Sequence, residues 1–212
     1  MLIRTREPIS VNVGPMFGSK TLGLIHTITS LEAVHRRVLV IKPSIDTRFG
    51  LDKIQSRTGG SHSAHAVPID NMDAIADLIA KQPDRIDMLA IDELQFFDPA
   101  IADLIVDVSQ AGIMVAGAGL HRDYRGNPFP TMERVMPLAT DLRLTNALCM
   151  HRHNGDRPCG MEAMMTQRLL NGQPDSYLSP TVIIEEVGTA VTYEARCLNH
   201  WAVADMPVRR KF

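Results

Sequence analysis

Short apolar runs alternate with amphipathic segments along most of this chain. Val38–Ile41, Met88–Ile91 and Ile113–Gly119 are almost entirely apolar, which is typical of strands buried on both faces. Between these runs, apolar residues recur every three or four positions, and this spacing predicts helices with one buried side. The segments with this helical spacing are 20–37, 71–81, 99–110 and 131–138.

Strand and helix patterns alternate about five times before residue 149. This order predicts an α/β fold with a parallel sheet and crossover helices on its faces. We also expect a strand at 64–69, a polar loop at 49–63, and the last strand of the main sheet at 142–148. Beyond that strand the pattern becomes irregular and rich in Cys and His, so we predict a nucleotide-binding domain at 1–146 and a small metal-binding domain at 147–212.

Composition narrows the class of protein further. A chain of 212 residues with 45% apolar residues can bury a sizeable core. The net charge of −2 argues against a general nucleic-acid binder, which would have a basic excess. No apolar run is long enough to span a membrane, and the first residues do not resemble a signal peptide. We therefore expect a cytoplasmic protein that binds neither nucleic acid nor membranes.

A candidate phosphate-binding loop lies at Val11–Leu22. A short β-branched run leads into a turn with Gly14 and Gly18, and Lys20-Thr21 opens a helical segment. A strand, a glycine turn and a helix start present free backbone N–H groups to a polyphosphate. Lys20 would reach the outer phosphates and Thr21 would hold Mg²⁺. Ser19 departs from the usual glycine before the lysine and could strain the turn or crowd a phosphate.

Paired carboxylates follow the apolar run at 88–91. Asp92 would hold magnesium through a water molecule, and Glu93 could take a proton from an attacking hydroxyl. Asp46 and Arg48 follow another predicted strand, at the sheet edge where α/β proteins bind ligands. They are candidates for contacts with magnesium-bound water and phosphate, although a solvated surface loop is an equally good interpretation.

The three cysteines all lie in the last third of the chain. Cys149, Cys159, Cys197 and His200 form two clusters with the ligand types of a structural zinc site. The long spacing between the first two cysteines leaves His151 or His153 as alternative nitrogen donors. Three unrelated buried thiols are the remaining interpretation.

Taken together, these motifs resemble the zinc-containing thymidine kinase family over nearly the whole chain. The matching stretches lie at 14–21, 40–48, 92–97, 119–129, 159–169 and 193–197. The chain departs from the family at Ser19 and in the insert between Cys149 and Cys159. The resemblance implies a P-loop (RecA-like) parallel sheet flanked by helices, with a small zinc-binding lasso domain. It also implies ATP-dependent phosphorylation of the thymidine 5′-hydroxyl, and of the deoxyuridine 5′-hydroxyl, by a homotetramer.

The same resemblance implies roles for individual residues. Glu93 is the general base, and the zinc ligands are Cys149, Cys159, Cys197 and His200. ATP and Mg²⁺ are bound by Gly14, Gly18, Ser19, Lys20, Thr21, Asp46, Arg48, Asp92 and Gln95. The nucleoside is bound by Met16, Phe96, Leu120, Tyr124, Phe129, Thr166, Gly188 and Tyr193, and backbone groups near Gly188 read the base edge.

Two other hypotheses stay open on the sequence. The chain could be a degenerate nucleotide-binding protein of the same fold, in which Ser19 prevents productive ATP binding. It could also be a nucleic-acid-dependent ATPase with a zinc ribbon, although its balanced charge argues against this.

Overall fold

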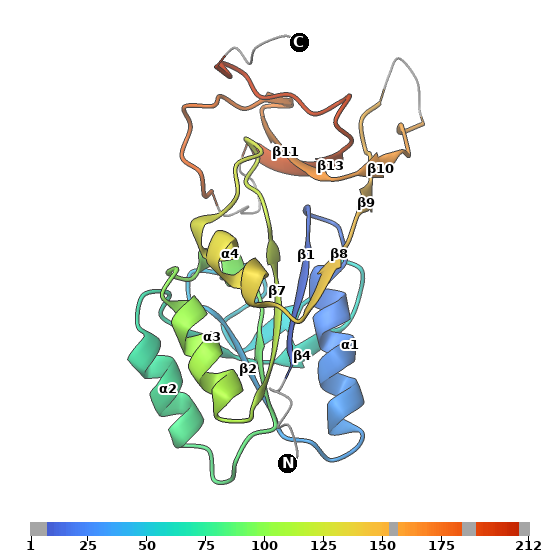
Figure 1. Ribbon diagram of the computed structural model, residues 1–212. Helices are drawn as coiled ribbons and strands as arrows, with labels where there is room; N and C mark the ends of the chain where they lie inside the picture. Colours follow the sequence, from blue (N-terminus) through green and yellow to red (C-terminus); the bar gives the residue numbers. More distant parts are fainter. Residues whose placement is uncertain (1–7, 153–156, 184–189, 208–212) are drawn as a thin grey trace.

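A parallel six-stranded sheet forms the centre of the protein (Figure 1). The computed structural model describes residues 8–152, 157–183 and 190–207. The sheet strands are β1 (Ile9–Gly14), β2 (Val38–Pro43), β5 (His65–Val67), β6 (Met88–Ile91), β7 (Met114–Leu120) and β8 (Asp141–Leu144). They lie in the order β5-β2-β6-β7-β1-β8, and every neighbouring pair is parallel. The predicted parallel sheet is therefore confirmed.

Helices cover both faces of this sheet (Figure 1). The helices are α1 (Lys20–Glu32), α2 (Met72–Ala80), α3 (Ile101–Gln110) and α4 (Pro130–Val135), with single 3₁₀ turns η1 (Leu94–Phe96) and η2 (Met136–Leu138). Side chains along the central strands β2, β6 and β7 alternate between two cores, as the strand period requires. In β6, Met88 and Ala90 pack in the α1 core, and Leu89 and Ile91 pack in the core under α2 and α3.

Two small antiparallel sheets stand above the carboxyl ends of the parallel strands (Figure 1). One pairs β9 (Ala147–Leu148) with β10 (Glu162–Ala163). The other has the order β12-β11-β13 and consists of β11 (Met165–Leu170), β12 (Gln173–Pro174) and β13 (Val191–Arg196). Because parallel strands end at this edge, the small sheets close one side of the region where a ligand is expected.

Three sequence expectations differ from the structure. Residues 49–63 are not all loop, because β3 (Lys53–Gln55) and β4 (Ser61–Ser63) form an antiparallel hairpin anchored by the buried Ile54. The strand expected at 142–148 is divided, since β8 ends at Leu144 and β9 pairs in a different sheet. The first helix ends at Glu32 rather than near residue 37, because His35 has a φ of 62° and breaks the helical path.

Among the described residues, no helix combines the length and apolar character needed to cross a membrane.

Candidate active site

The loop between β1 and α1 has the geometry of a phosphate cradle. It needs glycine at two positions because Thr145 lies against it: a Cβ on Gly14 would lie 2.3 Å from the Thr145 carbonyl oxygen, and one on Gly18 2.9 Å from the Thr145 hydroxyl. Ser19 adopts a φ of 57° without a side-chain capping bond, a conformation that favours glycine. The Lys20 ammonium donates to the Pro15 carbonyl at 2.6 Å.

The paired carboxylates after β6 face this loop. The Thr21 hydroxyl donates to the Asp92 carboxylate, 3.0 Å from its Oδ1. Glu93 adopts a φ of 50°, which turns the chain sharply at the end of the strand. One Glu93 oxygen pairs with the Arg48 guanidinium, and the other accepts from the Gln95 amide at 2.6 Å.

An ion-pair chain continues away from Glu93. Arg48 also pairs with Asp46 at 2.7 Å, and Asp46 pairs with the buried Lys42 ammonium at 3.0 Å. On the other side of Glu93, the Gln95 side-chain oxygen Oε1 accepts a hydrogen bond from the Leu120 N–H at 2.8 Å. The carboxylate of Glu93 is thus fixed from β2 on one side and from β7 on the other.

Burial sets the charge state of this cluster. It lowers the pKa of Lys20 to about 8, against the opposing effect of Glu93 and Asp92. Burial, together with the neighbouring Glu93 charge, raises the pKa of Asp92 to about 7. Burial also acts to raise the pKa of Glu93, but Arg48 and the Gln95 hydrogen bond outweigh it and hold the Glu93 pKa below its ordinary value. Glu93 is therefore an ionised, hydrogen-bonded carboxylate at neutral pH.

The raised pKa of Asp92 gives a stability prediction. The folded state binds more protons at this group than the unfolded state between about pH 4 and 7, so its contribution to stability falls as pH rises through that window. An asparagine cannot ionise. We expect Asp92→Asn to be more stable than the wild type at pH 8 without nucleotide, by on the order of 1–3 kcal/mol.

Urea unfolding at pH 5 and pH 8 measures this effect. Asp107→Asn, at an exposed position on α3, is the matched control and should change stability little at either pH. An Asp92→Asn variant that is less stable than the wild type at pH 8 would contradict the prediction.

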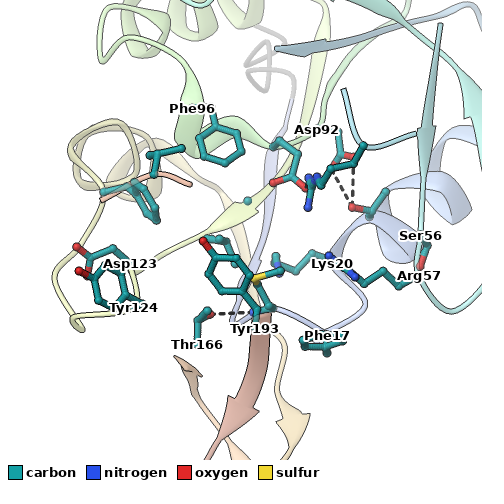
Figure 2. A pocket seen from close by; sticks show the side chains of 18 of the residues that line it. Phe17, Lys20, Ser56, Arg57, Asp92, Phe96, Asp123, Tyr124, Thr166 and Tyr193 are labelled. Atoms are coloured by element: carbon teal, nitrogen blue, oxygen red, sulfur yellow. Dashed lines mark hydrogen bonds and ion pairs between the residues drawn. The ribbon is translucent and has the colours of Figure 1, made fainter. Parts of the chain in front are cut away.

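A cavity of about 1080 Å³, part of it open to solvent, lies between the parallel sheet and the small sheets. Figure 2 shows Lys20 and Asp92 at the cavity, with Tyr124 and Phe96 on the side opposite Ser56 and Arg57. The predicted site residues that line it are Met16, Ser19, Lys20, Thr21, Arg48, Asp92, Glu93, Phe96, Leu120, Tyr124, Phe129, Thr166 and Tyr193. One space therefore joins the lysine, the carboxylates and the aromatic side chains.

Other predicted site residues lie behind the cavity or outside the described part of the chain. Four of them, Gly14, Gly18, Asp46 and Gln95, do not line the cavity. Asp46 and Gln95 contact residues that do line it, Arg48 and Glu93. Gly14 and Gly18 shape the loop between β1 and α1. Gly188 lies outside the described residues. Phe96 and Phe129 meet edge to face, with ring centroids 6.4 Å apart, and give the cavity an apolar wall.

Sequence reasoning missed one wall of the cavity. This wall comes from the β3–β4 hairpin, where Arg57 lies over the Phe17 ring at 5.2 Å. The only apolar signal in that hairpin is Ile54, so periodicity could not reveal its strands. The other cavity residues that were missed are Phe49, Gln55, Ser56, Thr58, Gly119, Arg122, Asp123, Thr181, Val182 and Ile183.

The small sheets hold a compact group of metal-ligand side chains. The structure brings together the four predicted ligands, Cys149, Cys159, Cys197 and His200, with one ligand atom of each within 4.8 Å of the others. His200 Nδ1 lies 3.5 Å from the sulfur of Cys149 and 3.3 Å from that of Cys197. A tetrahedral zinc site separates its ligand atoms by roughly 3.5–3.8 Å, so this donor set fits Zn²⁺. Of the alternative donors, His151 lies beside His200, with ring centroids 4.4 Å apart and ring planes tilted by 35°, and His153 lies outside the described residues.

A glycine-containing loop between the first strand and a helix that begins with Lys20-Thr21, facing an acidic pair at the end of a parallel strand, is the arrangement of the P-loop nucleotide-binding proteins. Comparison with known proteins gives the particular family. The model of the family described as "Thymidine kinase" matches residues 7–201. The chain belongs to the thymidine kinase family, and it is therefore a phosphotransferase.

Curated relatives named thymidine kinase are similar to this chain over most of its length. A protein of Pyrobaculum aerophilum is 37% identical over 91% of this chain and 97% of its own length. One from Deinococcus radiodurans is 35% identical over 88% of this chain and 86% of its own. One from Mesoplasma florum is 32% identical over 92% of this chain and 91% of its own. The similarity therefore covers both the parallel sheet and the cysteine-rich part of this chain.

Proposed function

We propose that this chain transfers the γ-phosphoryl group of ATP to the 5′-hydroxyl of thymidine, and of deoxyuridine, at the cavity between the two parts of the molecule. The observation that carries the proposal is that Lys20, Thr21, Asp92 and Glu93 border the same cavity as a set of aromatic side chains. Such a space can accept a triphosphate at one end and a nucleoside at the other. The family and its curated members support the activity.

The triphosphate would lie on the loop between β1 and α1. The N–H groups at the start of α1 and the Lys20 ammonium would bind its phosphates. Thr21 and Asp92, whose oxygens lie 3.0 Å apart, are oxygen ligands of the kind that Mg²⁺ prefers. Bound there, magnesium would neutralise charge on the phosphate oxygens. Arg48, which lines the cavity and pairs with Asp46 at 2.7 Å, would bind the γ-phosphate at this end of the site.

Glu93 would be the general base. It would take the proton of the 5′-hydroxyl as that oxygen attacks the γ-phosphorus, while the bond to the β-phosphate breaks and ADP leaves. The arriving phosphate anion would compete with Glu93 for Arg48. Withdrawal of the guanidinium would make Glu93 a stronger base once ATP is in place, since Arg48 holds the Glu93 pKa down. The Gln95 side-chain amide, which donates a hydrogen bond to the Glu93 carboxylate at 2.6 Å, would keep that carboxylate oriented.

The nucleoside would lie against the aromatic wall. Tyr124, Phe96, Phe129 and Tyr193 give this end the apolar character that a flat base requires. Met16, Leu120 and Thr166 complete it, and the Thr166 hydroxyl also accepts from the Met16 N–H at 3.0 Å. Backbone groups near Gly188 would read the base edge, as the family resemblance implies.

The direct test is ADP formation from ATP by the purified chain, with and without thymidine. The proposal requires nucleoside-dependent ADP and a phosphorylated nucleoside in equal amounts. ATP hydrolysis that DNA stimulates without any nucleoside would support the zinc-ribbon ATPase instead.

A degenerate nucleotide-binding protein is the second candidate, because Ser19 holds a left-handed conformation in the phosphate loop. Calorimetric binding of thymidine and ATP, measured apart from turnover, separates the two candidates. Tight thymidine binding without product would favour the degenerate protein.

Ser19 itself gives a prediction. A non-glycine residue in the left-handed region costs roughly 1–2 kcal/mol, and the extra freedom of glycine in the unfolded chain offsets about 0.4–1 kcal/mol of that. We expect Ser19→Gly to raise the free energy of unfolding by up to about 1 kcal/mol and to lower the KM for ATP. Denaturant unfolding and steady-state kinetics measure the two effects.

Ser30→Gly is the matched control for Ser19→Gly. Ser30 is exposed in the last turn of α1, where glycine should destabilise by up to about 0.5 kcal/mol and leave the KM for ATP unchanged. Equal destabilisation by both substitutions would show that Ser19 is not strained.

We further propose that Cys149, Cys159, Cys197 and His200 bind one structural Zn²⁺ ion, which fixes the small sheets at the edge of the cavity. The donor atoms and their separations support this. From the family resemblance we also expect a homotetramer, which light scattering of the purified protein measures.

A further inference from the structure

Arg168 on β11 is an unusual residue for the interior of a protein. Its side chain has no exposed surface, and it is among the largest fully buried side chains in the described part of the chain. A buried guanidinium destabilises a fold unless its charge and its N–H groups find partners. The partners of Arg168 therefore show what the residue is built to hold.

One partner is the wall of the proposed nucleoside site. The Arg168 guanidinium carbon lies 3.6 Å from the centre of the Tyr124 ring, which is close cation–π contact. Tyr124 lines the cavity, and its hydroxyl donates to the Ser176 carbonyl at 2.6 Å. Thr166, two positions before Arg168 on the same strand and thus on the same face, also lines the cavity.

The other partners belong to the segment that closes the same end of the cavity. Arg168 Nε donates to the Asp175 carboxylate at 2.7 Å, and Nη1 donates to the Thr181 carbonyl at 3.2 Å. Asp175 also accepts from the Ser176 N–H and from the Ser179 hydroxyl. Thr181 and the two residues after it line the cavity. Arg168 thus joins the Tyr124 wall to the 175–183 segment.

The remaining amino group indicates that this arrangement does not serve stability alone. Within the described residues, Arg168 Nη2 is buried without a hydrogen-bond partner. An unsatisfied buried donor lowers stability. An apolar side chain of similar volume would fill this place without that loss, but it would hold neither Tyr124 nor Thr181.

We propose that Arg168 is a positioning residue for the nucleoside: it fixes the Tyr124 ring and the Thr181 carbonyl relative to each other and so sets thymidine affinity, without contacting ATP. This inference rests on the proposed thymidine kinase activity. Lysine cannot replace arginine here, because a single ammonium group can neither bind Asp175 and Thr181 as a fork nor stack flat on a ring.

The test is the kinetics of Arg168→Lys in the full chain, with the KM for thymidine and the KM for ATP measured separately. We expect the KM for thymidine to rise roughly tenfold to a hundredfold, the loss of one or two charge-assisted contacts. The KM for ATP should stay within about threefold of the wild type, because the triphosphate end contains none of these contacts. Asp175→Asn should raise the KM for thymidine by a smaller factor. This second variant tests the proposal if Arg168→Lys fails to fold.

Arg134→Lys is the matched control. Like Arg168, Arg134 donates to a carboxylate and to a backbone carbonyl, those of Asp103 at 2.8 Å and Pro99 at 3.0 Å, but it lies on α4 and does not line the cavity. Arg134→Lys should leave both KM values unchanged. Equal rises in the two KM values, or a lower melting temperature with an unchanged KM for thymidine, would contradict the proposal and show that Arg168 has only a structural role. A wild-type protein that does not phosphorylate thymidine would instead refute the proposed function.

Discussion

Replacing Glu93 with glutamine will lower kcat by about 10²- to 10⁴-fold, the range typical of a lost general base. Glutamine keeps the size of the side chain and can still accept from the Gln95 amide, so the cavity should keep its shape. It cannot take the proton of the 5′-hydroxyl. The KM values for ATP and thymidine should change far less than kcat, because the group acts in the transition state. Steady-state kinetics with saturating ATP measure the effect.

Glu133→Gln is the control for this prediction. Glu133 is exposed on α4 and does not line the cavity, so its substitution should leave kcat unchanged. Turnover by Glu93→Gln close to that of the wild type would exclude the general-base role.

Removing zinc will unfold the small sheets and abolish turnover. Within the described residues, the apolar cluster around the proposed ligands has four buried members, which are Ala147, Cys149, Ala163 and Ala195. So small a cluster cannot hold the ligand-bearing segments together alone, whereas zinc contributes on the order of 10 kcal/mol in small zinc domains. We expect a large fall in melting temperature after chelation. Activity should return with added Zn²⁺ and not with Mg²⁺ alone.

The assay must contain excess Mg²⁺ throughout, so that chelation cannot act through the magnesium bound to ATP. His200→Asn should reduce the bound zinc, measured by mass spectrometry, and His26→Asn should not, because His26 is exposed on α1. Protein that is purified without zinc, or that keeps its melting temperature after chelation, would overturn the metal assignment.

The parts of the site that are short continuous motifs could be predicted from the sequence. The parts built from strands with little hydrophobic pattern could not. Lys20 follows a short β-branched strand and a glycine turn, and Asp92 follows a continuously apolar strand. Because parallel strands end at one sheet edge, their meeting followed from the fold class. The β3–β4 hairpin was missed because its strands are three residues long, and Ile54 is the single buried apolar residue in them. Short strands of this kind are determined by tertiary contacts more than by local pattern.

Arg168 illustrates the same limit for charged side chains. In sequence it follows Thr166 and Gln167 on a segment that could face solvent, and an arginine is rarely expected in a core. Its partners Tyr124, Asp175 and Thr181 lie between 7 and 44 residues away. Only the folded chain brings these groups together, so no spacing rule reveals them.

The hydrogen bond from the Met16 N–H to the Thr166 hydroxyl predicts how truncation would affect the protein. A fragment that stops after residue 146 would keep every strand of the parallel sheet, but the turn proposed to bind ATP would lose the hydrogen-bond acceptor that Thr166 supplies. Such a fragment should bind ATP more weakly than the intact chain. Nucleotide affinity would then depend on the whole polypeptide and not on residues 1–146 alone.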